Sequence, residues 1–202
     1  MRFLKTLAMA AIGVVLSTAA GEAHAQVTAY APGQGAVNSV AVAIDVRASV
    51  SGRCGFTAGG APTGSISQTD FDRTGFSRDF AISMNCTVAS RVAVSSRNGG
   101  LAAEVAASDG YAITAPYTVA LRMVADNGAA AEASCAAETL GAAGGCSFAG
   151  VASSTNGLRL AGAATKTNGS YLRVSAPAYT GTAPLVAGRY ADTLSVTISV
   201  AP

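Results

Sequence analysis

Two carboxylates spaced two residues apart are the first side chains whose type could support chemistry. Asp70 and Asp72 stand in the polar segment 70–75 and could form an acid–base pair or begin a calcium-binding loop. A loop of the EF-hand kind needs further oxygen ligands and a terminal glutamate, and the residues that follow do not supply them. The pattern therefore favours solvated loop charges over a catalytic or metal site.

Histidine is nearly absent, which limits catalysis further. The one histidine of the chain, His24, lies in an N-terminal segment that has the features of a signal peptide. Without it the chain has no imidazole for a catalytic triad, for a general base near neutral pH or for a zinc site. We therefore expect a protein that is not an enzyme and that uses no cofactor.

Residues 1–25 are predicted to be that signal peptide. Arg2 and Lys5 give it a positive start, an apolar run follows over residues 7–16, and Ala23-His24-Ala25 fits a cleavage site. The apolar run is too short for a comfortable membrane span, and no cysteine at the cleavage point could carry a lipid. An exported protein without a membrane anchor is expected, with Gln26 as its new N-terminus.

Four cysteines remain for an oxidising compartment, and they allow three pairings: Cys54, Cys86, Cys135 and Cys146. Proximity favours Cys135–Cys146 around a Gly/Ala-rich loop, which leaves Cys54–Cys86. No two cysteines form a CxxC pair and no histidine could assist them, so disulfides are favoured over a metal site.

The composition suits one domain of ordinary size. Thirteen basic and eleven acidic residues give a formal net charge of +2, which offers no electrostatic reason to expect nucleic acid or an anionic membrane as a partner. Charged residues make up only 12% of the chain, which is low for a free monomer that must stay apart from its copies.

The clearest structural pattern is an alternation of apolar and small or polar residues over 40–50. Because successive side chains of a strand point to opposite faces, it predicts a long strand with one apolar edge. The apolar positions are Val40, Val42, Ile44, Val46, Ala48 and Val50. A flexible leader precedes the strand, so we group residues 26–53 as leader and strand and 54–202 as the domain. An ordinary first strand paired within its own domain remains an alternative.

Further alternating segments lie between turn signals along the rest of the chain. Strands are expected over residues 80–86, 91–95, 117–124, 158–160, 171–174 and 190–200, with a hairpin turn at 98–100. The last strand places these residues on one face: Tyr190, Leu194, Val196, Ile198 and Val200. The Ala content of the stretch 129–150 could suggest a helix, but its Gly residues and short span argue against a long one. The spacing predicts an all-β, immunoglobulin-like β-sandwich.

Three segments carry a resemblance to a known family. Residues 44–50 leading to Cys54, the segment 82–86, and the tail 188–200 resemble the spore coat protein U domain, the subunit fold of archaic chaperone–usher pili. The resemblance implies an immunoglobulin-like fold that lacks its final strand, which leaves an apolar groove. A periplasmic chaperone fills the groove first, and the N-terminal strand of the next subunit then replaces it.

The resemblance also assigns roles. The apolar residues of 40–50 become the donor strand that enters a neighbour's groove, and the strand 190–200 borders this subunit's own groove. The implied partners are neighbouring pilus subunits, the chaperone and an outer-membrane usher, with passage through the periplasm to an extracellular pilus. Better-known pilins have a penultimate tyrosine, whereas this chain ends Ala201-Pro202, which weakens any transfer of their chaperone contacts.

Three functions therefore remain open. The first is a structural pilin, a stalk subunit or adaptor, that polymerises by donor-strand exchange and supports adhesion or biofilm formation. The second is a self-contained secreted immunoglobulin-like binding or adhesive module. A carboxylate-dependent hydrolase ranks last, because the chain lacks histidine and any recognisable acid pair.

Overall fold

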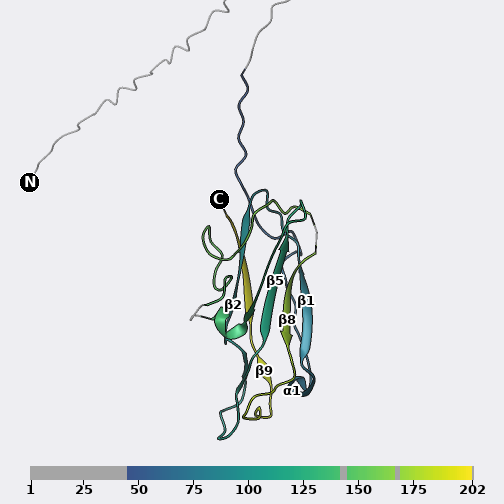
Figure 1. Cartoon of the computed structure of the whole chain (residues 1–202), viewed down its shortest axis with the longest axis vertical. Helices are drawn as coiled ribbons and strands as arrows, with labels where there is room; N and C mark the ends of the chain where they lie inside the picture. The colour runs from purple at the N-terminus through teal and green to yellow at the C-terminus, as the bar shows by residue number, and fades with distance from the viewer. Residues whose placement is uncertain (1–44, 142–144, 167–168, 202) are drawn as a thin grey trace, which may run out of the picture. The chain divides into compact units, whose positions relative to one another are not determined.

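The computed structural model describes residues 45–141, 145–166 and 169–201 (Figure 1). The chain divides into two compact units, residues 1–48 and 49–202, and the described strands and helices all belong to the second. Its described strands pair antiparallel in three sheets, and two short helical turns accompany them in the described part of the chain. The predicted all-β class is confirmed.

The largest sheet has four strands in the order β1-β8-β5-β6. They are β1 (Phe76–Ile82), β8 (Ser170–Ala176), β5 (Thr118–Val124) and β6 (Ala130–Ala136). In β5 every second residue is fully buried, as an alternating pattern in a half-buried strand requires. The sheet therefore has one face in the core and one face toward solvent.

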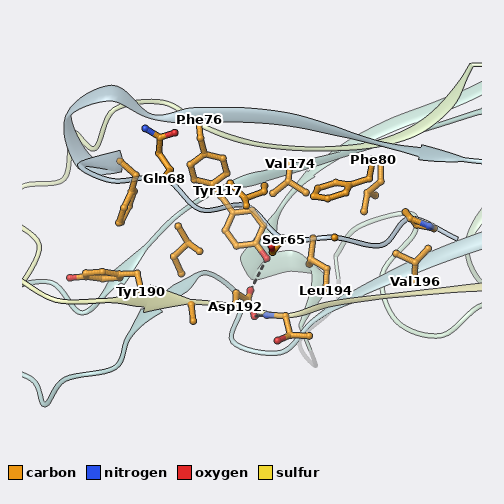
Figure 2. Close-up of a pocket in the computed structure, with 18 residues that line it drawn as sticks. Ser65, Gln68, Phe76, Phe80, Tyr117, Val174, Tyr190, Asp192, Leu194 and Val196 are labelled. Atoms are coloured by element: carbon orange, nitrogen blue, oxygen red, sulfur yellow. Dashed lines mark hydrogen bonds between the residues drawn. The ribbon is translucent and has the colours of Figure 1, made fainter.

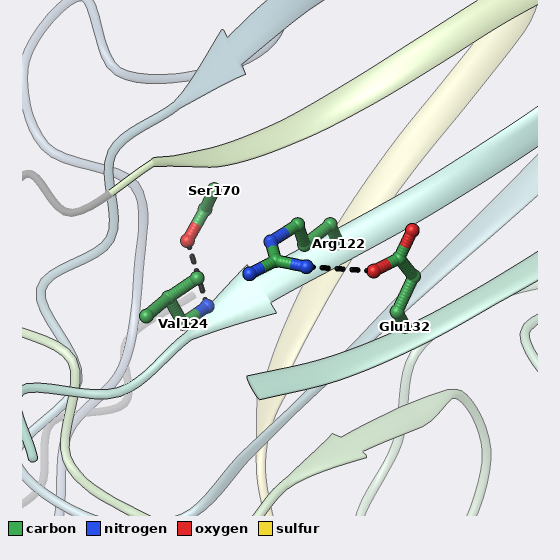
Figure 3. Close-up of polar contacts among 4 residues, drawn as sticks. All are labelled: Arg122, Val124, Glu132 and Ser170. Atoms are coloured by element: carbon green, nitrogen blue, oxygen red, sulfur yellow. Dashed lines mark hydrogen bonds and ion pairs between the residues drawn. The ribbon is translucent and has the colours of Figure 1, made fainter. Parts of the chain in front are cut away.

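Polar side chains on both faces of this sheet link neighbouring strands. Arg122 of β5 forms an ion pair with Glu132 of β6 at 2.8 Å (Figure 3). The hydroxyl of Ser170 on β8 accepts a hydrogen bond from the backbone N–H of Val124 at 2.9 Å. Both contacts join strands that are already paired, so they reinforce the register of the ladder.

Two aspartates at the surface have pKa values that folding lowers. The Arg173 guanidinium donates two hydrogen bonds to Asp79 across the β1–β8 pair and holds the pKa of that carboxyl below its usual range. The hydroxyl of Thr165, helped by the backbone N–H groups of Thr165 and Lys166, lowers the pKa of Asp126 in the same way. Both groups stabilise the folded chain only while they are ionised.

Two smaller sheets complete the fold. One has the order β10-β2-β7, formed by β10 (Leu194–Val200), β2 (Ser90–Ser96) and β7 (Leu158–Leu160). The other has the order β4-β3-β9, formed by β4 (Thr114–Ala115), β3 (Leu101–Ala103) and β9 (Tyr190–Ala191).

The helical elements are α1 (Phe71–Thr74) and η1 (Ala137–Leu140), each of a single turn. None of the helices in the described part of the chain has the length and hydrophobicity needed to cross a bilayer.

One hydrophobic core joins the four-stranded sheet to the β10-β2-β7 sheet. Val92 and Val94 of β2 are fully buried in the same cluster as Leu121 of β5 and Leu172 of β8. Phe148, which lies two residues after Cys146, is the largest of the fully buried side chains. Residues of the edge strands β1 and β10 enter this core only partly, so their apolar side chains stay accessible to solvent.

Both expected disulfides are present. Cys135 on β6 bonds to Cys146, and Cys54 bonds to Cys86. The Cys54–Cys86 bridge joins two segments that also pair through their backbones, because the N–H of Thr57 donates to the carbonyl of Ser83 at 3.0 Å. The pairing that proximity favoured is therefore confirmed.

Some expected strands are cut short or differently paired. The 80–86 strand is wrong at its end, because β1 stops at Ile82 and Cys86 forms only an isolated bridge. The hairpin at 98–100 is also wrong: β2 and β3 join different sheets and do not pair. The single strand 190–200 is divided into β9 and β10 at Asp192 and Thr193, for a reason given below.

The expected strand over 40–50 lies partly outside the described residues, which begin at 45. Val40, Val42 and Ile44 are not described, and residues 45–50 form no strand. Val46 and Val50 are 83% and 85% exposed, and Ala48 is exposed too. The structure therefore shows no strand over residues 45–50, and the role of the whole segment 40–50 stays a prediction.

Candidate functional site

An apolar groove lies where the edge of the four-stranded sheet approaches the edge of the β10-β2-β7 sheet. Its volume is about 380 Å³, and Figure 2 shows side chains reaching into it from opposite sides. Phe76, Phe80 and Val174 enter from the β1–β8 side, and Leu194 and Val196 enter from β10. These side chains are only partly buried, except for Val174, so the groove is a continuation of the core that solvent can reach.

The strands on both sides of the groove are edge strands. Among the described strands β1 pairs only with β8, and β10 pairs only with β2. An edge strand presents a row of backbone N–H and C=O groups without ladder partners, and such a row can template the addition of another strand. The groove thus combines apolar side-chain pockets with unpaired backbone, which are the two components that strand addition needs.

A carboxylate in the wall of the groove, between Tyr190 and Leu194, forms a compact hydrogen-bond cluster. Asp192 accepts hydrogen bonds from the hydroxyls of Tyr117 at 2.6 Å and Ser96 at 2.5 Å. The backbone N–H groups of Asn98 and Thr193 donate to it at 3.0 and 2.6 Å. This cluster explains the break between β9 and β10, because Asp192 turns toward three distant partners instead of continuing the ladder.

The electrostatics of this cluster indicate a structural role. Tyr117 is 3% exposed, and burial, together with its hydrogen bond to Asp192, raises the pKa of its hydroxyl. The tyrosine therefore stays protonated and donates to the carboxylate. The Ser96 hydroxyl that donates to Asp192 is only 7% exposed, and no group of acidic, cysteine or histidine side chains suitable for a metal ion occurs among the described residues.

The residues predicted to border a groove divide into two groups. Tyr190, Leu194 and Val196 line it, whereas Ile198 packs partly buried against the core and Val200 is 36% exposed outside it. The two aspartates of the sequence pattern, at positions 70 and 72, flank the start of α1 and make no joint site.

Sequence reasoning missed the other wall of the groove. Phe76, Leu172 and Tyr117 line it together with the anticipated β10 residues. Alternation around Phe80 was a usable signal for a strand, but nothing local indicates which strand edges face each other. Asp192 carried no signal at all, because its partners lie far away in the sequence.

Comparison with known proteins adds no constraint. No protein-family model matches the chain, and no match was found among curated proteins or solved structures.

Proposed function

We propose that the chain is a structural subunit of an extracellular chaperone–usher pilus, built as an immunoglobulin-like sandwich that lacks one strand and polymerised by donor-strand exchange. The observation that supports this most is the apolar groove between the unpaired edges of β1 and β10. The resemblance of residues 44–54, 82–86 and 188–200 to the spore coat protein U domain supports it from the sequence.

The donor in this proposal is the alternating segment 40–50 of a second copy. Its backbone would pair with an open strand edge, and its apolar face would enter the pockets beside Phe80 and Leu194. Val46 and Val50, which are exposed in this chain, would then become buried in the neighbour. Because the donor and the acceptor surfaces differ, the contact is heterologous and propagates as a fibre.

The remaining partners follow from the same mechanism. A groove this apolar needs protection before assembly, which is the role of a periplasmic chaperone, and an outer-membrane usher would then organise exchange. The fibre would support adhesion or biofilm formation at the cell surface. No cofactor, nucleic acid or membrane anchor has a part in this proposal.

The test compares two variants that carry the same added charge on opposite faces of the donor. Ile44→Asp with Val46→Asp places the charges on the apolar face, and Ala43→Asp with Ser49→Asp places them on the other face. We expect the purified mature chain and the second variant to form detergent-resistant oligomers on gels of unheated samples. We expect the first variant to remain monomeric. A mature chain that is itself a stable monomer would contradict the proposal.

One observation favours a second candidate, a self-contained secreted binding module. Residues 61–68 of the chain already run through the groove, with Pro62 and Ile66 among its lining residues. If this segment completes the domain, no donor is needed. Heat-stable, monodisperse full-length protein would support this candidate.

A further inference from the structure

The segment 61–68, which we term the groove segment, takes the path that an incoming strand would need. It begins after Gly60, whose carbonyl accepts a hydrogen bond from the N–H of Ser83 just beyond the end of β1. It ends before α1, which leads directly into the start of β1. The groove segment therefore runs back along β1, and in Figure 2 its Ser65 lies between the side chains of β1 and β10.

Despite this position, the groove segment does not join either sheet. Among the described residues, the backbone groups of 61–67 make no hydrogen bond, and no strand includes them. Thr63, Ser65 and Ser67 are exposed, and Ile66 is the side chain of the segment that packs against the core. One aliphatic side chain, rather than a ladder of hydrogen bonds, holds the middle of the segment in the groove.

Both ends of the groove segment are held much more firmly. The Cys54–Cys86 bridge and the hydrogen bond between Thr57 and Ser83 fix the chain before it. After it, the N–H of Tyr179 donates to the carbonyl of Asp72 at 2.7 Å and so ties α1 to the chain that follows β8. The middle can therefore leave the groove as a loop while its ends stay in place.

We propose that the groove segment is a displaceable internal cover, which shields the groove in the free subunit and is expelled when the donor strand enters. This inference rests on the proposed donor-strand function, because it concerns the same groove. Ile66 and a donor side chain cannot occupy one pocket, so the donor binds only the fraction of molecules in which the cover is open. Because expelling the cover breaks no backbone hydrogen bond, its displacement is cheap compared with the ladder that replaces it.

The experiment uses the mature chain carrying Ile44→Asp and Val46→Asp, so that it can accept a donor but not provide one. The probe is a fluorescent synthetic peptide with the sequence of residues 38–52. Association rates are measured by fluorescence anisotropy for this acceptor, for the acceptor with Ile66→Ala, and for the acceptor with Thr63→Ala. Thr63→Ala is the matched control, because it truncates an exposed side chain of the same segment.

We expect Ile66→Ala to raise the association rate about tenfold. The substitution removes roughly half of the free energy gained by burying an isoleucine, so the covered state becomes less stable and a larger fraction of molecules is open. We expect Thr63→Ala to stay within about twofold of the parent, as a surface substitution should. Equal or slower association of the Ile66→Ala acceptor would overturn the cover while leaving donor binding intact. A peptide that binds none of the three acceptors would instead overturn the proposed function and the cover with it.

A second measurement follows the Ile66 side chain directly and does not require the Ile66→Ala substitution. In the free acceptor its methyl groups lie in a groove lined by Phe71, Phe76 and Phe80, so their NMR signals should show aromatic ring shifts. On saturation with the peptide they should move to the positions of an unstructured isoleucine. Signals that keep their ring shifts in the saturated complex would show that the segment stays in the groove, and would overturn the inference.

Discussion

Replacing Asp192 by alanine should destabilise the chain more than most single substitutions at its surface. The carboxylate accepts hydrogen bonds from the hydroxyls of Tyr117 and Ser96 and from the backbone N–H groups of Asn98 and Thr193. Alanine removes every one of these acceptors at once. The residues that lose a partner include Tyr117 and Ser96, which are only 3% and 7% exposed.

The magnitude follows from those two buried hydroxyls. A buried donor without a partner costs about 1–3 kcal/mol, so two of them give roughly 2–6 kcal/mol. Asp192 itself lies at the groove and is partly accessible, so water can replace some of the lost contacts and the lower half of this range applies. We expect Asp192→Ala to lower the free energy of unfolding by about 3 kcal/mol. Tyr117→Phe should cost only about 1 kcal/mol, because the carboxylate keeps its other donors.

The assay is urea unfolding of the monomeric acceptor described above, with its disulfides intact, followed by circular dichroism. Asp109→Ala is the control, because Asp109 is exposed and its side chain makes no hydrogen bond in the described part of the chain. The Asp192→Ala/Tyr117→Phe double variant should be about 1–2 kcal/mol more stable than the sum of the single effects implies. A loss below about 1 kcal/mol for Asp192→Ala, or fully additive effects, would refute the reasoning.

Three further outcomes are expected. Leu194→Asp should weaken binding of the 38–52 peptide at least tenfold, because it places a charge in the apolar groove. Ser195→Asp, on the exposed side of the same strand, should leave the affinity unchanged. Equal affinities of the two variants would count against the groove as the binding site. Folding lowers the pKa of Asp79 and of Asp126, so the stability that they give is present above about pH 4 and is lost on acidification. When the free energy of unfolding is measured as the pH is lowered, a variant with asparagine at both positions should therefore lose less stability than the parent. Ser90→Ala should stabilise the chain by about 1 kcal/mol in urea unfolding, because the buried Ser90 hydroxyl finds no hydrogen-bond partner among the described residues. A loss of stability would show that this hydroxyl is satisfied in solution.

The strands that could be predicted from the sequence are those whose buried face consists of large residues. The segment 117–124 anticipated β5 because Val119, Leu121 and Met123 alternate with residues of the other face, and all three are fully buried. The short strand β7 was predicted at its observed bounds, Leu158–Leu160. In both cases the side chains that fill the core also carry the local signal.

The strand β6 was missed for the opposite reason. Its residues alternate between exposed and partly buried positions, but the inner positions are Ala131, Ala133 and Cys135. Small residues leave almost no contrast in hydrophobicity between the two faces, so the stretch 129–150 could be described only by its composition. The break at Asp192 was beyond local reasoning for another reason, since its partners Ser96 and Tyr117 are 96 and 75 residues away in the sequence.

The four-stranded sheet and the β10-β2-β7 sheet have two pairs of facing edges, and these two pairs differ in a way that bears on assembly. On one side, the edge strand β6 contacts both β7 and η1, and the Cys135–Cys146 bridge ties β6 to the following loop. Its inner side chains are small, and β7 and η1 lie close to it, so an added strand would find few pockets and little room there. On the other side, Phe76, Phe80 and Leu194 surround a groove that the chain fills only loosely.

This asymmetry fixes the form of any assembly made by strand addition. Large apolar side chains at an open edge are costly in water, and they are retained only where something else covers them. In the described part of the chain, the groove between β1 and β10 combines open strand edges with large apolar side chains, whereas β6 has small inner side chains, so each subunit would offer that groove as acceptor together with one donor segment. Subunits linked in this way can form a chain but cannot branch, since branching would require a second acceptor edge. Electron micrographs of polymerised protein should therefore show unbranched fibres, and branched networks would mean that the β6 edge also accepts strands.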